Sequence, residues 1–358
     1  MNRIHNFSAG PAILPVPVVN ASVKAIEEYN GLGMSVMEMS HRSKPIVAMF
    51  EETNANVLDL MKLSADNYAV LFLGGGASMQ FAMVAYNFLK GTADYINTGT
   101  WASNAIKEAK KLGNVNVAAS SEDTNFNYIP KAYNLSPNAD YLHYTSNNTI
   151  FGTEFKHIPQ TNAPLICDMS SDLFAREMDF SKFDLIYAGA QKNIGPAGAT
   201  MVVIKKSFLD KINSNLLTML SYKTHVDKES MFNTPPVFPV FVVGETLKWI
   251  KNEGGLKAIE QRNIHKANLI YNVVDENSSF YKGSVIHKED RSLMNLTFNL
   301  PSEELEEKFI KEAKAKNLDG LKGHRSVGGV RASTYNACPV ESCQALADFM
   351  KEFYVNNK

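Results

Sequence analysis

The segment Tyr187-Ala-Gly-Ala-Gln-Lys192-Asn-Ile-Gly-Pro-Ala-Gly198 places one lysine in a turn of small residues, between mostly apolar runs at 184–188 and 199–204. Short apolar runs that do not alternate with polar residues are typical of strands buried on both faces. The glycines would let the backbone pass close to a bound ring or phosphate. A lysine near a low-dielectric core loses its proton more easily and can attack an aldehyde. Taken alone, the segment favours the alternative of an exposed loop lysine, because most lysines lie at the surface.

Similar runs recur towards the N-terminus and alternate with helical patterns. Strands are predicted at residues 68–73, 94–97, 115–118, 141–144 and 164–168, in addition to 184–188 and 199–204. Helices are predicted at residues 45–62, 78–89 and 101–112. Strand, helix and strand in series imply crossover units and a mainly parallel sheet, which the helices flank.

The pattern changes after Pro239. Helices are predicted there at residues 239–252, 256–277, 302–316 and 339–353, and strands at 293–299 and 327–332. Gly254 and Gly255 separate the first two of these helices. The sequence therefore predicts an α/β chain of three parts. They are an N-terminal segment (1–15) that packs with the small domain, a large domain (16–254), and a smaller C-terminal α+β domain (255–358).

Composition narrows the class of protein. The 358 residues include 36 Lys and Arg and 37 Asp and Glu, a net charge of -1, so neither nucleic acid nor an acidic membrane is an expected partner. No window approaches the ~20 apolar residues of a membrane span, and the N-terminus lacks a secretory signal. Three cysteines, Cys167, Cys338 and Cys343, without a C-x-x-C pair argue against a disulfide framework or a paired-cysteine zinc site. We expect a cytoplasmic protein without a metal site.

Asp168 closes the apolar run that precedes the lysine segment. Ligands bind parallel sheets at the carboxyl ends of strands, so Asp168 would face the same crevice as Lys192. A buried carboxylate needs a cationic partner, and an aspartate on a pyridinium nitrogen with a lysine Schiff base is the signature of pyridoxal phosphate. The alternative is that Asp168 caps the next turn through Ser170 or Ser171. With Lys192 counted, the sequence favours the cofactor site.

Two further features suit such a cofactor. The segment Leu73-Gly-Gly-Gly-Ala77-Ser78 ends a predicted strand and begins a predicted helix. Free N–H groups and the helix dipole bind phosphate at such a point, although a flexible turn is the alternative. Trp101 begins the helix after the next strand, where its indole could either stack on a flat ring or pack in the core.

Histidine and arginine occur together in two places, at His41-Arg42 and at His324-Arg325, with Arg331 nearby. Arginine binds carboxylate or phosphate through paired hydrogen bonds, and a charged histidine adds a donor. The alternative is that these residues form surface salt bridges. The sequence contains neither a P-loop nor a G-x-G-x-x-G fingerprint.

With these motifs, the chain resembles the phosphoserine aminotransferases, in the class V group of fold type I pyridoxal-phosphate enzymes. The resemblance runs nearly end to end and includes Asn6-Phe-Ser-Ala-Gly-Pro11, Met37-Glu-Met-Ser-His-Arg42, Met231-Phe-Asn-Thr-Pro-Pro236 and the segment 322–336. It implies the fold type I transferase architecture and pyridoxal 5'-phosphate as the cofactor. Some members of the family have an arginine directly after the three glycines, where this chain has Ala77 and Ser78.

The resemblance also implies a role for each residue of the site. Lys192 would carry the cofactor as a Schiff base, and Asp168 would keep its ring nitrogen protonated. Further cofactor contacts would come from Gly76, Ala77, Trp101, Thr149 and Gln191, and from Asn233 and Thr234 of the partner subunit. Arg331 would bind the substrate α-carboxylate. The distal anion would meet His324 and Arg325, with His41 and Arg42 of the partner subunit.

The activity implied by the resemblance is reversible amino transfer between L-glutamate and 3-phosphohydroxypyruvate, which gives O-phospho-L-serine and 2-oxoglutarate. The family also implies a homodimer with shared active sites. The reaction serves L-serine biosynthesis, and the 4-phosphohydroxy-L-threonine step of pyridoxine biosynthesis is a further candidate. One alternative is a related class V lyase such as a cysteine desulfurase, which needs a reactive cysteine and usually a histidine where this chain has Gln191. The other is a non-catalytic binding protein on the same fold, against which the intact Lys192 and Asp168 argue.

Overall fold

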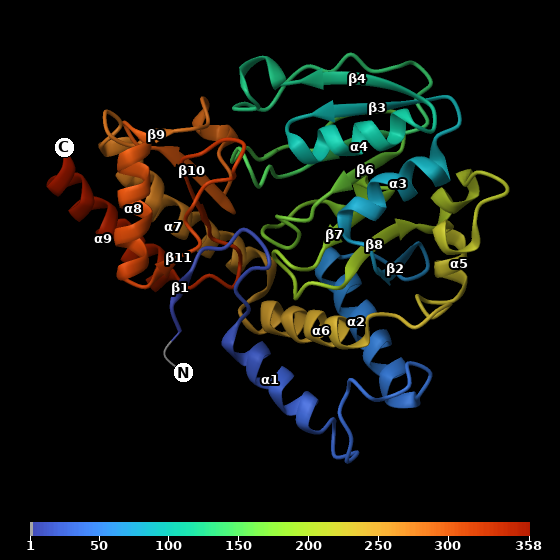
Figure 1. The fold of residues 1–358 in the computed structure, drawn as a ribbon. Helices are drawn as coiled ribbons and strands as arrows, with labels where there is room; N and C mark the ends of the chain where they lie inside the picture. Colours follow the sequence, from blue (N-terminus) through green and yellow to red (C-terminus); the bar gives the residue numbers. More distant parts are fainter. Residues whose placement is uncertain (1–2) are drawn as a thin grey trace.

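The structure, a computed structural model that describes residues 3–358, is centred on a seven-stranded sheet (Figure 1). Its strands are β2 (Tyr68–Leu73), β3 (Thr92–Asn97), β4 (Asn114–Ser120), β5 (Leu142–Thr145), β6 (Leu165–Asp168), β7 (Leu185–Gly189) and β8 (Thr200–Lys205). Their order is β2-β8-β7-β6-β5-β3-β4, and β8 alone runs opposite to the other six strands of this sheet within the described residues. The predicted mainly parallel sheet is therefore confirmed, with all seven predicted strands present.

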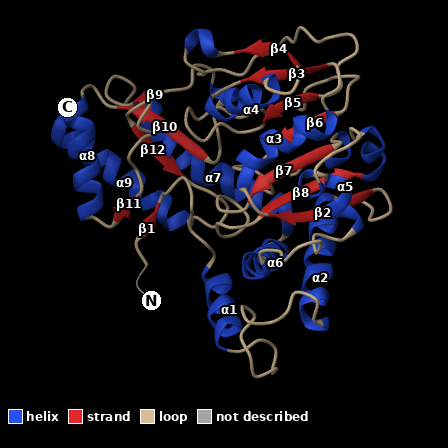
Figure 2. Cartoon of the chain, turned by 45° about the vertical axis from the view of Figure 1, so that its right-hand side comes forward, coloured by secondary structure: helices blue, strands red, loops and turns tan. Residues whose placement is uncertain are grey.

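Helices cover both faces of this sheet. They are α1 (Val16–Glu27), α2 (Lys44–Met61), α3 (Gly76–Phe88), α4 (Thr100–Lys110), α5 (Tyr222–Asp227) and α6 (Val237–Asn252). Figure 2 shows α1, α2 and α6 together on one side of the sheet. On β2, Val70 and Phe72 face the core shared with α2 and α6, whereas Leu71 and Leu73 face the core shared with α3 and α4. Because both faces are buried, the strands show no polar alternation.

A smaller group of elements follows α6. Its strands are β9 (Lys282–Gly283), β10 (Asn295–Asn299), β11 (Leu318–Asp319) and β12 (Val330–Ser333), and its helices are α7 (Gly255–Glu276), α8 (Glu303–Ala315) and α9 (Val340–Asn357). β12, β10 and β9 form an antiparallel sheet. The strand predicted at 327–332 begins late, at Val330, because Gly328 and Gly329 have positive φ angles of +73° and +70° and form a turn.

The N-terminal segment contacts this smaller group. Strand β1 (His5–Asn6) pairs in parallel with β11, and Phe7 lies in the smaller core. Helix α7 contributes to both cores, since Ile259 lies in the larger one and Ile270 in the smaller one. The division into 1–15, 16–254 and 255–358 stays a prediction, and the first two residues of its N-terminal segment lie outside the described residues.

Candidate active site

Five strands of the large sheet end at one edge, and a predicted site residue follows or ends each of them. β3, β5, β6 and β7 are parallel neighbours, and β2 shares their direction because β2 and β7 are both antiparallel to β8. Along the chain, Gly76 follows β2, Trp101 follows β3, Thr149 follows β5, Asp168 ends β6 and Lys192 follows β7. The carboxyl ends of parallel strands are where α/β proteins bind ligands. The sheet therefore brings together five of the predicted residues.

Lys192 points to two of these residues. Its Nζ donates a 2.7 Å hydrogen bond to Thr149 Oγ1 and lies 5.4 Å from the centre of the Trp101 ring. The lysine is half-buried. The alternative of an exposed loop lysine is therefore wrong.

The environment of Lys192 makes its amine easier to deprotonate than that of an ordinary lysine. Desolvation lowers the pKa of Lys192 to about 8, opposed by the negative charge of Asp168 and reinforced by the positive charge of Arg331. An amine with this pKa is unprotonated more often near neutral pH than an ordinary lysine is, and only the unprotonated amine is a nucleophile or a base. The side chain is thus suited to bond an aldehyde and to transfer a proton.

Asp168 is buried at the end of β6, with 3% of its surface exposed. The backbone N–H and the hydroxyl of Ser170 donate to Asp168 Oδ1 at 2.9 and 2.6 Å. Desolvation raises the pKa of Asp168, and the Ser170 bonds and the Lys192 charge offset part of this rise. Asp168 Oδ1 thus caps the following turn, as the alternative expected. Asp168 Oδ2 takes no part in these two bonds and can accept from another donor.

The turn between β2 and α3 has an open outer face. Gly75 and Gly76 have φ angles of +88° and +65°, which a residue with a Cβ rarely adopts. A Cβ at Gly76 would meet no atom within 4 Å, and no side chain caps the start of α3. The free N–H groups at this point, including that of Ala77, form an anion-binding helix start. Gln191 precedes Lys192 in the turn after β7. Its carbonyl accepts a 2.9 Å hydrogen bond from the N–H of Ala12.

Arg331, on β12, reaches the same edge from the smaller sheet. Its Nη1 donates to the carbonyl of Thr149 at 3.2 Å, so Thr149 contacts both Lys192 and Arg331. Its buried Nε has no hydrogen-bond partner among residues 3–358. Desolvation and the charges of Arg331 and Arg325 lower the pKa of His324, so His324 lies within electrostatic range of both arginines. β12 and the loop before it thus contribute a cationic wall, formed by Arg331 and Arg325 with the His324 imidazole near both.

Four further predicted residues, His41, Arg42, Asn233 and Thr234, come from two other segments of the chain. His41 and Arg42 lie between α1 and α2, a segment at the lower end of the molecule in Figure 1 and Figure 2. Arg42 is exposed, whereas the buried Nε2 of His41 has no hydrogen-bond partner within the described chain. Asn233 and Thr234 are exposed and line a cavity of about 420 Å³ that also touches the glycine turn.

The structure reveals a contact residue that sequence reasoning missed. Asn193 is 5% exposed, and its Oδ1 accepts a 2.9 Å hydrogen bond from the N–H of Asn336. Its Nδ2 donates to the carbonyl of Leu173 at 2.7 Å. Position next to Lys192 was the only signal in the sequence, because its partners lie far along the chain.

The residues at this edge fit pyridoxal phosphate. A desolvated amine, a buried carboxylate with an available oxygen, and an indole beside the amine match the aldehyde, the ring nitrogen and the ring face. The uncapped start of α3 matches the phosphate. The indole N–H of Trp101 is buried and finds no hydrogen-bond partner in residues 3–358, so a polar group fits beside it. Lys192, Asp168, Trp101 and the glycine turn are the residues that could hold the cofactor.

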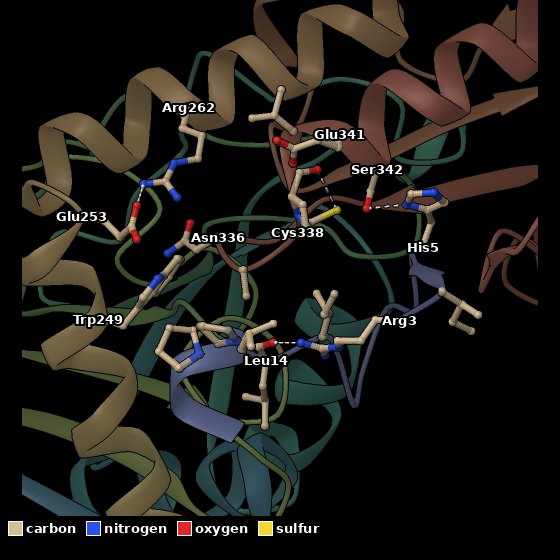
Figure 3. Close-up of a pocket in the computed structure, with 18 residues that line it drawn as sticks. Arg3, His5, Leu14, Trp249, Glu253, Arg262, Asn336, Cys338, Glu341 and Ser342 are labelled. Atoms are coloured by element: carbon tan, nitrogen blue, oxygen red, sulfur yellow. Dashed lines mark hydrogen bonds and ion pairs between the residues drawn. The ribbon is translucent and has the colours of Figure 1, made fainter. Parts of the chain in front are cut away.

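A second cavity, of about 680 Å³, lies apart from this edge (Figure 3). The N-terminal segment, α6, α7 and the start of α9 line it. Its polar groups are largely paired: His5 Nδ1 lies 2.9 Å from Ser342 Oγ, and Arg262 bonds Glu253 at 2.7 Å. Because no predicted site residue lines this cavity, it is not the candidate active site.

Two kinds of feature are absent from residues 3–358. No helix there has both the length and the apolar character needed to span a membrane. That part of the chain also holds no group of three or more His, Cys, Asp or Glu side chains that could bind a metal ion.

Known proteins resemble this chain over nearly its whole length. Residues 4–346 match the family model described as aminotransferase class-V. A protein of Flavobacterium psychrophilum named phosphoserine aminotransferase is 54% identical over 350 residues, which cover 97% of this chain and 98% of the relative. The solved phosphoserine aminotransferase of Bacillus circulans subsp. alkalophilus is 49% identical, with a TM-score of 0.97 and 99% of each chain covered. A structure titled as PLP-bound phosphoserine aminotransferase from Trichomonas vaginalis is 36% identical, with a TM-score of 0.92 over 98% of this chain and all of that one. The predicted fold class is confirmed.

Proposed function

The chain belongs to the class-V aminotransferases, and on that basis we propose that it is a phosphoserine transaminase that uses pyridoxal 5'-phosphate. It would transfer the amino group of L-glutamate to 3-phosphohydroxypyruvate, giving 2-oxoglutarate and O-phospho-L-serine. The observation that carries this proposal is the placement of Lys192 between Thr149, the Trp101 ring and the charge of Asp168. Together with the uncapped start of α3 for the phosphate, these groups would supply the contacts that the cofactor needs at one edge of the sheet.

Bound pyridoxal phosphate would supply an aldehyde that takes up amino groups and a protonated ring that accepts the electron pair of the substrate Cα. Lys192 would bind this aldehyde and, once released, its Nζ would remove the Cα proton and return it. Because desolvation lowers the pKa of Lys192 to about 8, a fraction of the Lys192 amine is unprotonated near neutral pH and can accept a proton. Asp168, buried at the end of β6, would hold the ring-nitrogen proton through its available Oδ2.

Both substrates carry an anion at each end, and the cationic wall provides for both. Arg331 would bind the α-carboxylate, because its guanidinium lies at Thr149 beside Lys192 and still has an unpaired N–H in the described chain. His324, which lies within electrostatic range of Arg331 and of Arg325, would bind the γ-carboxylate or the phosphate together with Arg325. The planar fork of Arg331 at one end, with the Arg325 cation and a hydrogen-bond donor from the His324 imidazole at the other, would orient the Cα hydrogen towards Lys192.

We further propose that the enzyme is a homodimer with shared active sites. His41, Arg42, Asn233 and Thr234 do not contact Lys192, and a second copy of the chain would bring them to it. Large apolar side chains near these residues are exposed: Met37 by 57%, Phe232 by 40% and Met79, at the glycine turn, by 40%. Exposed large apolar side chains beside residues that are expected to act in the partner's site are consistent with a protein interface.

A cysteine desulfurase is the less favoured activity. Its chemistry needs an accessible thiolate, and Cys167, Cys338 and Cys343 are all buried. Cys338 is 1% exposed, and its Sγ lies 4.0 Å from that of Cys343. Buried free thiols also support the proposed cytoplasmic location, because reducing compartments keep thiols unpaired.

The test is an assay of the purified protein with L-glutamate and 3-phosphohydroxypyruvate, in which O-phospho-L-serine and 2-oxoglutarate are both measured. We expect the two products in equal amounts and no sulfide when cysteine is supplied. Sulfide release without phosphoserine formation would favour the desulfurase instead. A colourless protein that borohydride leaves unchanged would favour the non-catalytic alternative.

A further inference from the structure

Three asparagine side chains converge on one short stretch of main chain that follows Asp168 and its turn. The Nδ2 groups of Asn193, Asn336 and Asn263 donate to the carbonyls of Leu173, Phe174 and Ala175, at 2.7, 2.9 and 2.9 Å in that order. Phe174 has a φ of +61°, a left-handed conformation that a bulky residue seldom adopts. The surrounding contacts therefore hold this stretch in its shape.

The three asparagines come from three different parts of the fold. Asn193 follows Lys192 on the turn between β7 and β8, Asn336 follows β12, and Asn263 lies on α7. Their exposed fractions are 5%, 1% and 0%. Figure 3 shows Asn336 in the wall of the separate cavity, between α7 and the start of α9.

One bond in this cluster joins the loop that follows β7 of the larger sheet to the loop that follows β12 of the smaller one. The N–H of Asn336 donates to Oδ1 of Asn193 at 2.9 Å. Asn193 adjoins the proposed proton-transfer group, Lys192, and Asn336 belongs to the segment that continues from Arg331. Lys192 and Arg331 are also joined through Thr149. The segments of Lys192 and Arg331 are therefore connected twice, once through Thr149 and once through the bond between Asn193 and Asn336.

The two connections differ in what a substrate would do to them. The bonds to Thr149 are made by the side chains of Lys192 and Arg331, which must engage the substrate. The bond between Asn193 and Asn336 involves neither of those side chains, so it can persist while Lys192 and Arg331 bind the substrate. Other bonds also connect the two parts of the fold, such as that from Asn147 Nδ2 to Asn295 Oδ1 at 2.8 Å, but the bond between Asn193 and Asn336 is the one that adjoins Lys192 and lies on the segment of Arg331.

We propose that Asn193 is a positioning residue for the transamination proposed above, on which this inference rests. Its Oδ1 holds the strand of Arg331 in register with the turn of Lys192. The substrate Cα must lie at Lys192 Nζ while Arg331 holds its carboxylate, and a displacement of about 1 Å can cost about a hundred-fold in rate. Losing the link should therefore reduce catalysis more than binding.

Asn193→Ala and Asn336→Ala form a matched pair for the test. Asn193→Ala removes the acceptor of the link. Asn336→Ala removes the bonds to Phe174 and Asn263 but keeps the backbone N–H that donates to Asn193. We expect Asn193→Ala to lower kcat by about ten- to a hundred-fold with little change in the KM for glutamate, because correct positioning is worth factors of this order. Asn336→Ala should retain most of kcat, although both variants lose two side-chain hydrogen bonds.

Hydrogen exchange gives a readout that does not depend on activity. The backbone amide of position 336 should exchange faster in Asn193→Ala and stay protected in Asn336→Ala, with or without cofactor. If Asn193→Ala does not fold, Asn193→Ser provides the same comparison, since its hydroxyl is too short to replace the amide oxygen.

Equal kcat values in the two variants, or a wild-type kcat in Asn193→Ala, would overturn the proposal. A fall in thermal stability without a fall in kcat would make Asn193 merely structural and would overturn it too. Wild-type protein without transaminase activity would instead overturn the proposed function. In that case the exchange at position 336 would still show whether the link exists.

Discussion

The Lys192 ammonium donates a 2.7 Å hydrogen bond to the hydroxyl of Thr149, while the carbonyl of the same threonine accepts a bond from Arg331. One buried residue thus contacts both the group proposed to move the Cα proton and the group proposed to bind the α-carboxylate. Thr149 lies in the turn that follows β5, and β5 is the strand that pairs with the strand of Asp168. The predictions below test the consequences of this arrangement.

Replacing Thr149 with valine should slow catalysis. Valine has a similar shape but no hydroxyl, so the Lys192 amine loses its partner while the backbone bond to Arg331 remains. A hydrogen bond to a charged group contributes about 1.5–3 kcal/mol, so we expect kcat to fall by about ten- to a hundred-fold with a nearly unchanged KM for glutamate. Thr149→Ser, which keeps the hydroxyl, is the control. Steady-state rates that are equal for the valine and serine variants would contradict the role of the hydroxyl.

The lowered pKa of Lys192 predicts how stability depends on pH. Desolvation reduces this pKa from 10.5 to about 8 in the folded chain, so between these values the unfolded chain binds more protons. Stability must then rise with pH from about 8 to 10.5, since burying the charged amine is unfavourable below that window. Lys266 is also buried with a pKa lowered to about 8, so both lysines contribute.

Melting temperatures of cofactor-free protein across this pH range separate the two lysines. Wild type and Lys192→Met should differ in slope between pH 8 and 10.5, because only wild type keeps the Lys192 contribution. Lys266 titrates in both proteins and cancels in the comparison. Identical slopes would show that Lys192 has an ordinary pKa.

Replacing Arg331 with glutamine should weaken the binding of both substrates. The variant loses the charge and the paired donors that the carboxylate needs. Because a charged hydrogen bond contributes about 1.5–3 kcal/mol, we expect the KM values for glutamate and phosphohydroxypyruvate to rise by roughly ten- to a hundred-fold. Cofactor content, measured by absorption, should stay at the wild-type level. Loss of cofactor with unchanged KM would place Arg331 in the cofactor site.

Replacing Arg42 with alanine should raise the KM for phosphohydroxypyruvate and leave the cofactor content unchanged, because Arg42 is proposed to bind the distal anion from the partner subunit. Loss of cofactor would instead assign Arg42 to the cofactor phosphate. Mixing Arg42→Ala with inactive Lys192→Ala tests whether sites are shared. A hybrid dimer would contain one site with both native residues, so phosphohydroxypyruvate turnover at low substrate should exceed that of either variant alone. Mixed samples that only average the two variants would contradict shared sites.

Much of the fold could be predicted because its strands are buried on both faces. Runs such as 68–73 carry apolar residues at every position, and the structure confirms these strands to within two residues. Helix α1 was not predicted, because its apolar residues do not form one buried stripe. Val16 and Val23, for example, are 51% and 49% exposed. Strands β1 and β11 were also missed, because two residues paired over a long sequence separation leave no local pattern.

The candidate site divides in a similar way. Residues at strand ends, such as Asp168 and Lys192, could be placed together from the order of strands and the direction of a parallel sheet. The position of Arg331 relative to Thr149 depends on how the two sheets meet, which no local pattern records. The asparagine cluster around Leu173–Ala175 was invisible for the same reason, since Asn193 and Asn336 lie 143 residues apart.

Borohydride reduction of the purified protein, followed by peptide mapping, tests most directly whether Lys192 binds pyridoxal phosphate opposite Asp168. Wild type should carry one reduced pyridoxyl group per chain, on the peptide that contains Lys192, and Lys192→Ala should carry none while keeping its fold by circular dichroism. Asp168→Asn should still carry the group on Lys192 but catalyse poorly. A label on another lysine, or no label on a folded wild-type protein, would contradict the assignment of this site.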